Sequence, residues 1–302
     1  MRRENNLFRS HWLMIGSLGG VLAGLSLLHG QAIFMWLALA FLWSISGNFF
    51  GGFLWGLIAV LISHSWLLAL HPLSWIGVPV PLSLPIAVSL WLFCGGCGGL
   101  LVGIWSLIAN APLFKGLRDG CFGEKVLCIL VLSCVWGLAE VVLASSPLFW
   151  IGVGGSVLPA DKYLAGLARW FGAGGLATVQ LLIGSWLWQM AIAVRRGIGW
   201  KKSFSFGLFF VVLAHLVGAS LLSAKSFSEV IPVALWQSDI PIRTKFTEEQ
   251  QNRIPYALNE SFQIAENLSA SLLVAPEGTL SPNQELLLPA QIPLLTGGFR
   301  WV

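Results

Sequence analysis

The sequence FFGGFLWGLIAVLISHSWLLAL, at positions 49–70, decides the fold class of this 302-residue chain. Its length matches the ~20 apolar residues that a helix needs to cross a bilayer. The sequence around it extends the pattern, because no Asp, Glu, Lys or Arg occurs between Arg9 and Lys115. A water-soluble fold does not tolerate such a gap, whereas a charge at the bilayer centre costs roughly 2.5–3.5 kcal/mol. The chain is therefore expected to be an integral membrane protein.

The overall composition agrees with this class. Hydrophobic residues make up 56% of the chain and charged residues only 10%, whereas soluble domains carry about 25% charged residues. The 16 Trp and 34 Gly are typical of interfacial belts and of close helix packing. The net charge of +4 does not indicate a nucleic-acid partner, because the basic residues cluster in short loops.

Apolar segments predict a polytopic α-helical bundle of about seven spans within residues 1–224. The segments are Trp12–Leu28, Ala32–Ser46, Phe49–Leu70, Leu84–Ile108, Val126–Ala144, Leu167–Val194 and Phe204–Leu222. The second segment is short, and its boundaries are the least defined. The first follows Met1-Arg-Arg3 but has no small-x-small cleavage site, so we interpret it as a retained helix and not as a signal peptide.

The basic residues predict the orientation of the bundle. They form three clusters: Arg2, Arg3 and Arg9; Lys115, Arg118 and Lys125; and Arg195, Arg196, Lys201 and Lys202. With a cytoplasmic amino terminus, all three clusters lie in the cytoplasm, and only Lys162 and Arg169 fall in a short outer loop. This arrangement follows the positive-inside rule. Residues after about 224 are then expected on the periplasmic or extracytoplasmic side.

Residues 225–302 change in character and predict a partial soluble α/β segment. Val230–Gln237 and Ser271–Ala275 are typical of short buried strands, and Leu294–Gly297 is interpreted as the start of a third strand. A strand, a helix and a second strand in succession predict a parallel pair with a right-handed crossover.

The helix between the first two strands has its own start signal. Thr247-Glu-Glu-Gln250 is a capping box, in which Thr247 is the N-cap and Gln250 reaches back to it. Pro255 is expected to kink this helix or to restart it.

Glu277 is the main candidate for chemistry. It follows the second predicted strand directly, and open α/β sheets build their sites beyond the carboxyl ends of strands. On position alone, a solvated loop carboxylate is the favoured interpretation. However, Leu273-Val-Ala-Pro-Glu-Gly-Thr279 resembles the Pro-Glu segment of the nitrilase superfamily, whose catalytic triad is Glu, Lys and Cys. The resemblance implies that Glu277 is the general base.

Further stretches make the chain similar to the apolipoprotein N-acyltransferase family, in which a nitrilase-like domain lies outside the membrane behind a helical bundle. Val233–Pro241, followed by Lys245, resembles the first strand of that domain and its Gln-x-x-Ile-Pro motif. Trp136-x-x-x-Glu140 resembles the membrane Trp/Glu motif, and Phe149–Gly154 resembles the loop after it. The resemblance adds residues with either a substrate-binding or a structural role: Trp136, Glu140, Trp150, Gln237 and Lys245.

The resemblance also implies a function. Residues 1–224 would be the transmembrane domain, and residues 225–302 the amino-terminal part of the nitrilase-like domain. The enzyme would sit in the bacterial inner membrane and move an acyl chain from a phospholipid to the N-terminal amine of a diacylglyceryl-cysteine lipoprotein. The reaction passes through a thioester and needs neither a metal nor an organic cofactor.

The chain departs from the family pattern at several positions. Leu143 stands where the family has Arg, and Phe246 where it often has Trp. No Lys and no Cys follows Glu277, although the triad Lys and Cys of the family lie downstream of the Glu. The chain is therefore expected to be an amino-terminal portion that is inactive alone. A non-catalytic membrane protein, such as a transporter or a lipid-binding scaffold with a degenerate outer segment, is the alternative.

Other polar residues in the apolar half carry weaker hypotheses. Glu140 lies in an apolar span, so a functional site and a hydrogen-bonded structural role are both open. Cys94-Gly-Gly-Cys97 has redox spacing, but close helix packing by Gly95, Gly96, Gly98 and Gly99 accounts better for this stretch. His64 and His71 are expected to mark the interface and not a metal site. The belt tryptophans are expected to be Trp66, Trp75, Trp91 and Trp150.

Overall fold

The computed structural model describes residues 11–146, 152–197, 199–223, 230–245, 247–280, 286 and 292–297. The chain divides into two compact units. One comprises Met1–Leu68 with Val88–Lys225, and the other comprises Ala69–Ala87 with Ser226–Val302.

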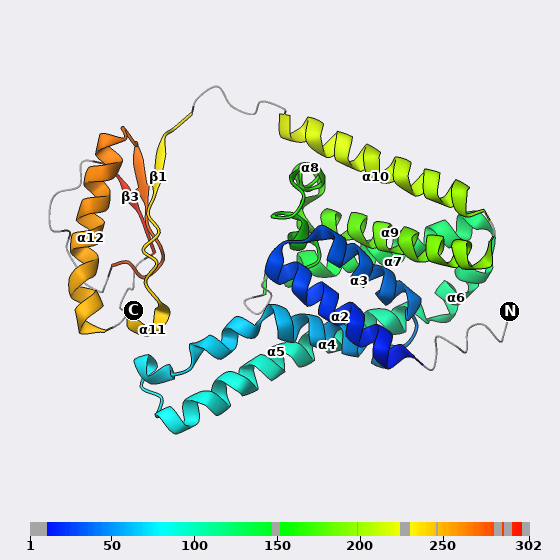
Figure 1. The fold of residues 1–302 in the computed structure, drawn as a ribbon, viewed down its shortest axis with the longest axis horizontal. Helices are drawn as coiled ribbons and strands as arrows, with labels where there is room; N and C mark the ends of the chain where they lie inside the picture. The colour runs from blue at the N-terminus through cyan, green and yellow to red at the C-terminus, as the bar shows by residue number, and fades with distance from the viewer. Residues whose placement is uncertain are drawn as a thin grey trace. The chain divides into compact units, whose positions relative to one another are not determined.

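Apolar helices dominate the described residues up to Ser223 (Figure 1). Five of the helices in the described part are long and apolar enough to cross a membrane: α2 (Trp12–His29), α5 (Val80–Ala109), α7 (Phe122–Leu143), α9 (Ala168–Arg196) and α10 (Trp200–Ser223). Two further apolar helices are shorter, α3 (Ala32–Ser44) and α4 (Phe49–Ser63). The remaining short elements are η1 (Ser65–Leu70), η2 (Leu73–Ile76), α6 (Pro112–Asp119), η3 (Gly154–Val157) and α8 (Lys162–Ala165). These helices are consistent with the predicted helical membrane bundle, while the number of spans stays a prediction.

Two helix boundaries differ from the prediction for physical reasons. The predicted helix 49–70 ends at Ser63, and the chain continues as the 3-10 helix η1. The Ser63 hydroxyl lies 3.3 Å from the Val60 carbonyl and 3.0 Å from Nδ1 of His64, and such side-chain contacts compete with the regular helix. Helix α5 starts at Val80, ahead of the predicted start, because Pro81 falls in its first turn, where a missing N–H costs no bond.

A cluster of four tryptophans forms part of the bundle core. Trp105 lies at its centre, with ring centroids 5.3 Å from Trp43 and 5.5 Å from Trp136, and Trp55 lies 6.2 Å from Trp136. All three pairs pack edge to face, which is a favoured geometry for aromatic rings. The indole N–H groups of Trp43, Trp55 and Trp105 each donate to a backbone carbonyl. The tryptophans of this chain therefore fill the bundle core, in addition to any positions at the membrane interface.

The tryptophans that were expected in belts have mixed surroundings. Trp66 is 41% exposed, and Trp91 is half-buried and donates to the Leu61 carbonyl at 2.7 Å. The side chain of Trp75 and the whole of Trp150 lie outside the described residues.

Small residues let α4 and α5 approach closely. A Cβ on Gly56 would lie 2.4 Å from the Gly98 carbonyl oxygen, so the two backbones touch. Gly95 and Gly99 also face side chains of α4, which supports the predicted packing role for these three glycines of α5. Gly96 has nothing within 4 Å of an added Cβ, so its predicted packing role is wrong.

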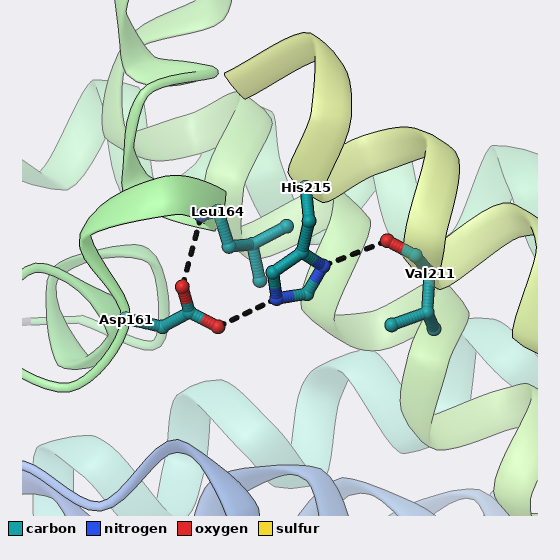
Figure 2. A network of polar contacts seen from close by, with 4 residues as sticks. All are labelled: Asp161, Leu164, Val211 and His215. Carbon is teal, nitrogen blue, oxygen red and sulfur yellow. Dashed lines mark hydrogen bonds and ion pairs between the residues drawn. The ribbon is translucent and has the colours of Figure 1, made fainter. Parts of the chain in front are cut away.

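A polar contact ties α8 to α10 (Figure 2). The Asp161 carboxylate caps α8 by accepting the Leu164 N–H at 3.0 Å, and its other oxygen lies 2.6 Å from Nε2 of His215. Nδ1 of His215 lies 2.7 Å from the Val211 carbonyl oxygen. Both ring nitrogens therefore face oxygen atoms. The Val211 carbonyl can only accept, so Nδ1 supplies the hydrogen of that bond, and a second hydrogen lies between Nε2 and the Asp161 carboxyl group.

The second unit contains a small parallel sheet. Strands β1 (Val233–Leu235), β2 (Leu272–Val274) and β3 (Leu294–Leu295) lie in the order β1-β2-β3. Both pairs are parallel, which confirms the predicted pairing of the first two strands. Helices α11 (Ile242–Lys245) and α12 (Glu248–Asn267) connect β1 to β2, and Figure 1 shows α12 alongside the strands.

The apolar face of α12 and one face of the sheet form the core of this unit. Leu258, Phe262 and Ala265 of α12 are buried in one cluster with Leu273 of β2, and Ala234 of β1 packs against it. On β1 the neighbouring side chains are exposed: Val233 is 45% and Leu235 is 79% exposed.

One expectation for α12 is wrong. Thr247 occupies the N-cap position, but its side chain makes no cap hydrogen bond. Its hydroxyl donates instead to the Thr244 carbonyl at 2.7 Å, because the short helix α11 ends just before it. The helix continues through Pro255 to Asn267 without a restart, and the alternative of a kink at Pro255 stays a prediction.

Candidate active site

Glu277 lies just beyond the carboxyl end of β2. The Ala275 N–H donates to the Leu295 carbonyl and the Gly278 N–H to the Gly297 carbonyl, both at 2.9 Å. The chain on either side of Glu277 therefore runs beside the end of β3. The Glu277 side chain is exposed, so its carboxylate is open to a reactant.

Gly297 limits the path of the Glu277 side chain. A Cβ on Gly297 would lie 2.9 Å from Cγ and 3.3 Å from Cα of Glu277. No real Cβ makes so short a contact without displacing its neighbour. The Glu277 side chain therefore passes directly over Gly297, where a larger residue would have to displace it.

Two threonines hold the turn that contains Glu277. The hydroxyls of Thr279 and Thr296 both donate to the Pro276 carbonyl, at 2.6 Å and 2.9 Å. Thr279 is only 4% exposed. These bonds link the end of β2 to the end of β3 at the residue next to Glu277.

Lys245, the last residue of α11, reaches the same place. Its ammonium donates to the backbone carbonyl of Glu277. The Lys245 carbonyl accepts the Gln251 side chain at 2.7 Å, which ties α11 to α12. The carboxyl ends of β2 and β3 and the connection that follows β1 thus contribute to one site, as parallel sheets favour.

Gln237 makes a different contact. Its side-chain N–H donates to the Asp239 carboxylate at 2.9 Å. In the described part of the chain, its side-chain hydrogen bond therefore goes to a neighbouring loop residue and not to Glu277.

Glu140 forms a buried anchor within the helical unit. It is 7% exposed, and one carboxylate oxygen accepts Trp136 Nε1 at 2.8 Å and the Val153 N–H at 2.6 Å. The other oxygen accepts the Gly154 N–H at 3.0 Å. A Cβ on Gly152 would lie 2.4 Å from the carboxyl carbon of Glu140. The geometry favours the structural role, in which α7 holds the loop that enters η3.

Gln180 of α9 completes this anchor and was not singled out from the sequence. It is fully buried, and its side-chain N–H donates to the Val153 carbonyl. Its oxygen accepts the Ser156 hydroxyl at 3.4 Å. Trp150, on the same predicted loop, lies outside the described residues.

Gly297 was also missed, although a weak signal for it exists. It stands two residues after the end of β3, as Pro276 stands two residues after the end of β2. Both residues occupy the edge where a parallel sheet builds its site.

The cysteines and histidines form no metal site in the residues that the structure covers. No group of three or more His, Cys, Asp or Glu side chains there is placed to hold a metal ion. Cys94 and Cys97 are free thiols. His64 contacts the Ser63 hydroxyl at 3.0 Å, and His71 contacts the Ser83 hydroxyl at 2.9 Å.

Comparison with known proteins relates this chain to one family by sequence. No family model matches it. It is 54% identical to a protein named apolipoprotein N-acyltransferase from Prochlorococcus marinus, across 97% of this chain and 59% of that protein. Proteins of the same name from a second Prochlorococcus marinus strain and from Parasynechococcus marenigrum are 48% and 47% identical, across 96% and 97% of this chain and 58% and 61% of those proteins.

Identity at this level runs through nearly all of the chain, including both units, and confirms the resemblance noted in its motifs. The chain spans about three fifths of the length of these curated relatives. It is therefore a homologue of the apolipoprotein N-acyltransferases, aligned with about three fifths of their length.

Proposed function

We propose that this chain forms the membrane bundle and part of the catalytic domain of an apolipoprotein N-acyltransferase. Residues 1–224 are the bundle, with about seven spans, and residues 225–302 belong to a nitrilase-like domain. The observation that carries the proposal is the place of Glu277, at the carboxyl end of β2 between Lys245 and Gly297. The names of the relatives support the same activity.

The reaction has two acyl-transfer steps. A cysteine thiolate attacks the ester carbonyl of a phospholipid, which forms a thioester and releases a lysophospholipid. The α-amine of a diacylglyceryl-cysteine lipoprotein then attacks the thioester, which forms an amide and regenerates the thiol. A carboxylate must take a proton from the thiol and later from the amine.

Glu277 fits the role of this carboxylate. It is exposed to reactants, while its main chain is fixed by hydrogen bonds on both sides. The thiol and the triad lysine have no counterpart after Glu277 in this sequence. We assign them to the two fifths of the relatives that this chain does not cover, and so expect no acyl transfer by this chain alone.

The proposed location is the bacterial inner membrane. The basic clusters favour a cytoplasmic amino terminus. The α/β segment then lies on the outer side, where both the phospholipid acyl donor and the lipoprotein acceptor are accessible.

A chimaera tests the proposed function. Residues 1–297 of this chain replace the matching part of the Prochlorococcus marinus relative that is 54% identical, in cells depleted of their own N-acyltransferase. We expect the chimaera to restore growth and N-acylated lipoprotein, detected by mass spectrometry, and the chain alone to restore neither. The full-length relative is the positive control. A chimaera that inserts in the membrane without acylating lipoprotein contradicts the proposal, as does restoration by the chain alone.

A further inference from the structure

We infer that Lys245 is a positioning residue, which holds the main chain of the general base Glu277. This inference rests on the proposed function. It concerns a lysine that lies upstream of Glu277 in the sequence and contacts its backbone, and it assigns Lys245 no direct contact with substrate.

The first observation is the peptide plane between Glu277 and Gly278. Its carbonyl oxygen accepts the Lys245 ammonium, and its N–H donates to the Gly297 carbonyl at 2.9 Å. Both polar groups of one peptide unit are therefore held by different elements. Because this plane starts at the Cα of Glu277, holding it helps to fix the Cα–Cβ bond from which the carboxylate extends. Loss of Lys245 would release the carbonyl side of the plane.

The second observation is that Lys245 is itself firmly placed. Its backbone N–H donates to the Pro241 carbonyl at 3.0 Å, and its own carbonyl accepts the Gln251 side chain at 2.7 Å. Gln251 belongs to α12, whose apolar face packs on the sheet. The lysine is half-buried, so its stem follows the protein surface and its head reaches the end of β2.

The third observation is the support on the other side of Glu277. The hydroxyls of Thr279 and Thr296 both donate to the Pro276 carbonyl, at 2.6 Å and 2.9 Å, and the Gly278 N–H donates to the Gly297 carbonyl. None of these bonds involves Lys245. The bond from Lys245 to the Glu277 carbonyl is therefore a separate restraint, and its loss leaves the other bonds of the turn with their partners.

Three variants of the active chimaera test this inference. Lys245→Met removes the charge and the hydrogen bond but keeps the length of the side chain. Lys245→Arg keeps both the charge and donors. Arg253→Met, on the exposed side of α12 with a side chain that is 70% exposed, is the matched control for loss of a positive charge.

We expect Lys245→Met to lower kcat by about 10–100-fold, because a small misplacement of a catalytic group has costs of this size. The KM values for phospholipid and lipoprotein should stay near those of the unmutated chimaera. Lys245→Arg should recover most of kcat, because it keeps a donor for the Glu277 carbonyl, and Arg253→Met should change neither kcat nor KM.

Two results would overturn the role of Lys245. One is an unchanged kcat in Lys245→Met. The other is a loss of kcat that Lys245→Arg does not rescue, which would make Lys245 a purely structural residue. The proposed function fails by a different result, near-normal turnover in Glu277→Gln. If Glu277→Gln is inactive and Lys245→Met is normal, the function stands and the positioning role is wrong.

Discussion

Glu140 illustrates, at the scale of one residue, what a motif leaves open. An acid in an apolar span predicts either a site or a structural bond, and the sequence offers no means to choose. The choice depends on the loop around Val153, which returns to α7 and presents two backbone N–H groups to the carboxylate. A protein hydrogen bond contributes about 0.5–1.5 kcal/mol net, and a buried donor left without a partner costs about 1–3 kcal/mol. The burial and the three donors explain why an acid is accommodated there.

A prediction for Glu140 follows from these donors. Glu140→Gln replaces one acceptor oxygen by an NH₂ group, which must then face an N–H donor. We expect the variant to lose about 1–3 kcal/mol of stability, seen as a lower thermal unfolding midpoint in detergent. Glu260→Gln, on the exposed side of α12, is the control and should melt like the unmutated protein. Equal midpoints for all three proteins would show that the buried carboxylate is not an anchor.

The candidate site shows the same division between what a sequence can and cannot predict. The strand end and the Pro-Glu segment were enough to single out Glu277. The contacts of Lys245 and Gly297 with it were not predictable, because they depend on the register of three strands and on a lysine 32 residues away in sequence.

At the scale of elements, the apolar runs located the helices and the local polar residues decided where they end. Hydrophobic length is a strong signal, because each span must match the membrane thickness. Helix ends depend on weaker and competing hydrogen bonds. Helix α4 ends at Ser63 and His64, before the apolar sequence itself ends. The Thr247 hydroxyl bonds back to Thr244 instead of capping α12.

The contact between α8 and α10 supports a second prediction. The side chains of His215 and Asp161 are only 28% and 18% exposed, so water does not fully replace a lost partner. His215→Ala leaves one oxygen of Asp161 without its ring donor, and we expect about 1–3 kcal/mol of lost stability. Thermal unfolding in detergent measures the effect. The exposed His11 provides the control variant His11→Ala, and equal midpoints for the two variants would exclude a stabilising role for the pair.

At the scale of the whole molecule, the charge gap between Arg9 and Lys115 was sufficient to predict a membrane protein. The tryptophan cluster was not predictable in the same way. The composition shows that tryptophan is abundant, and a belt position is the usual reason for this in membrane proteins. Burial of Trp43, Trp55 and Trp105 arises only when four helices, α3, α4, α5 and α7, bring them together with Trp136.

The orientation in the membrane is a prediction for the whole chain. We expect a cysteine at Gly116, in the basic helix α6, to resist an impermeant thiol reagent in intact cells, because the predicted topology places this segment in the cytoplasm. A cysteine at Asn252, on the exposed side of α12, should react. The native cysteines are replaced by serine first. Reaction at both positions, or only at position 116, would contradict the predicted topology.

The central claim is that Glu277 is the general base of acyl transfer, and turnover by the chimaera tests it most directly. Glu277→Gln keeps the size of the side chain but removes the basic oxygen, and Glu260→Gln makes the same change on the exposed side of α12. We predict that Glu277→Gln lowers kcat by about 10²–10⁴-fold, with an unchanged thermal midpoint and a normal rate for Glu260→Gln. Turnover by Glu277→Gln close to that of the unmutated chimaera would contradict the claim.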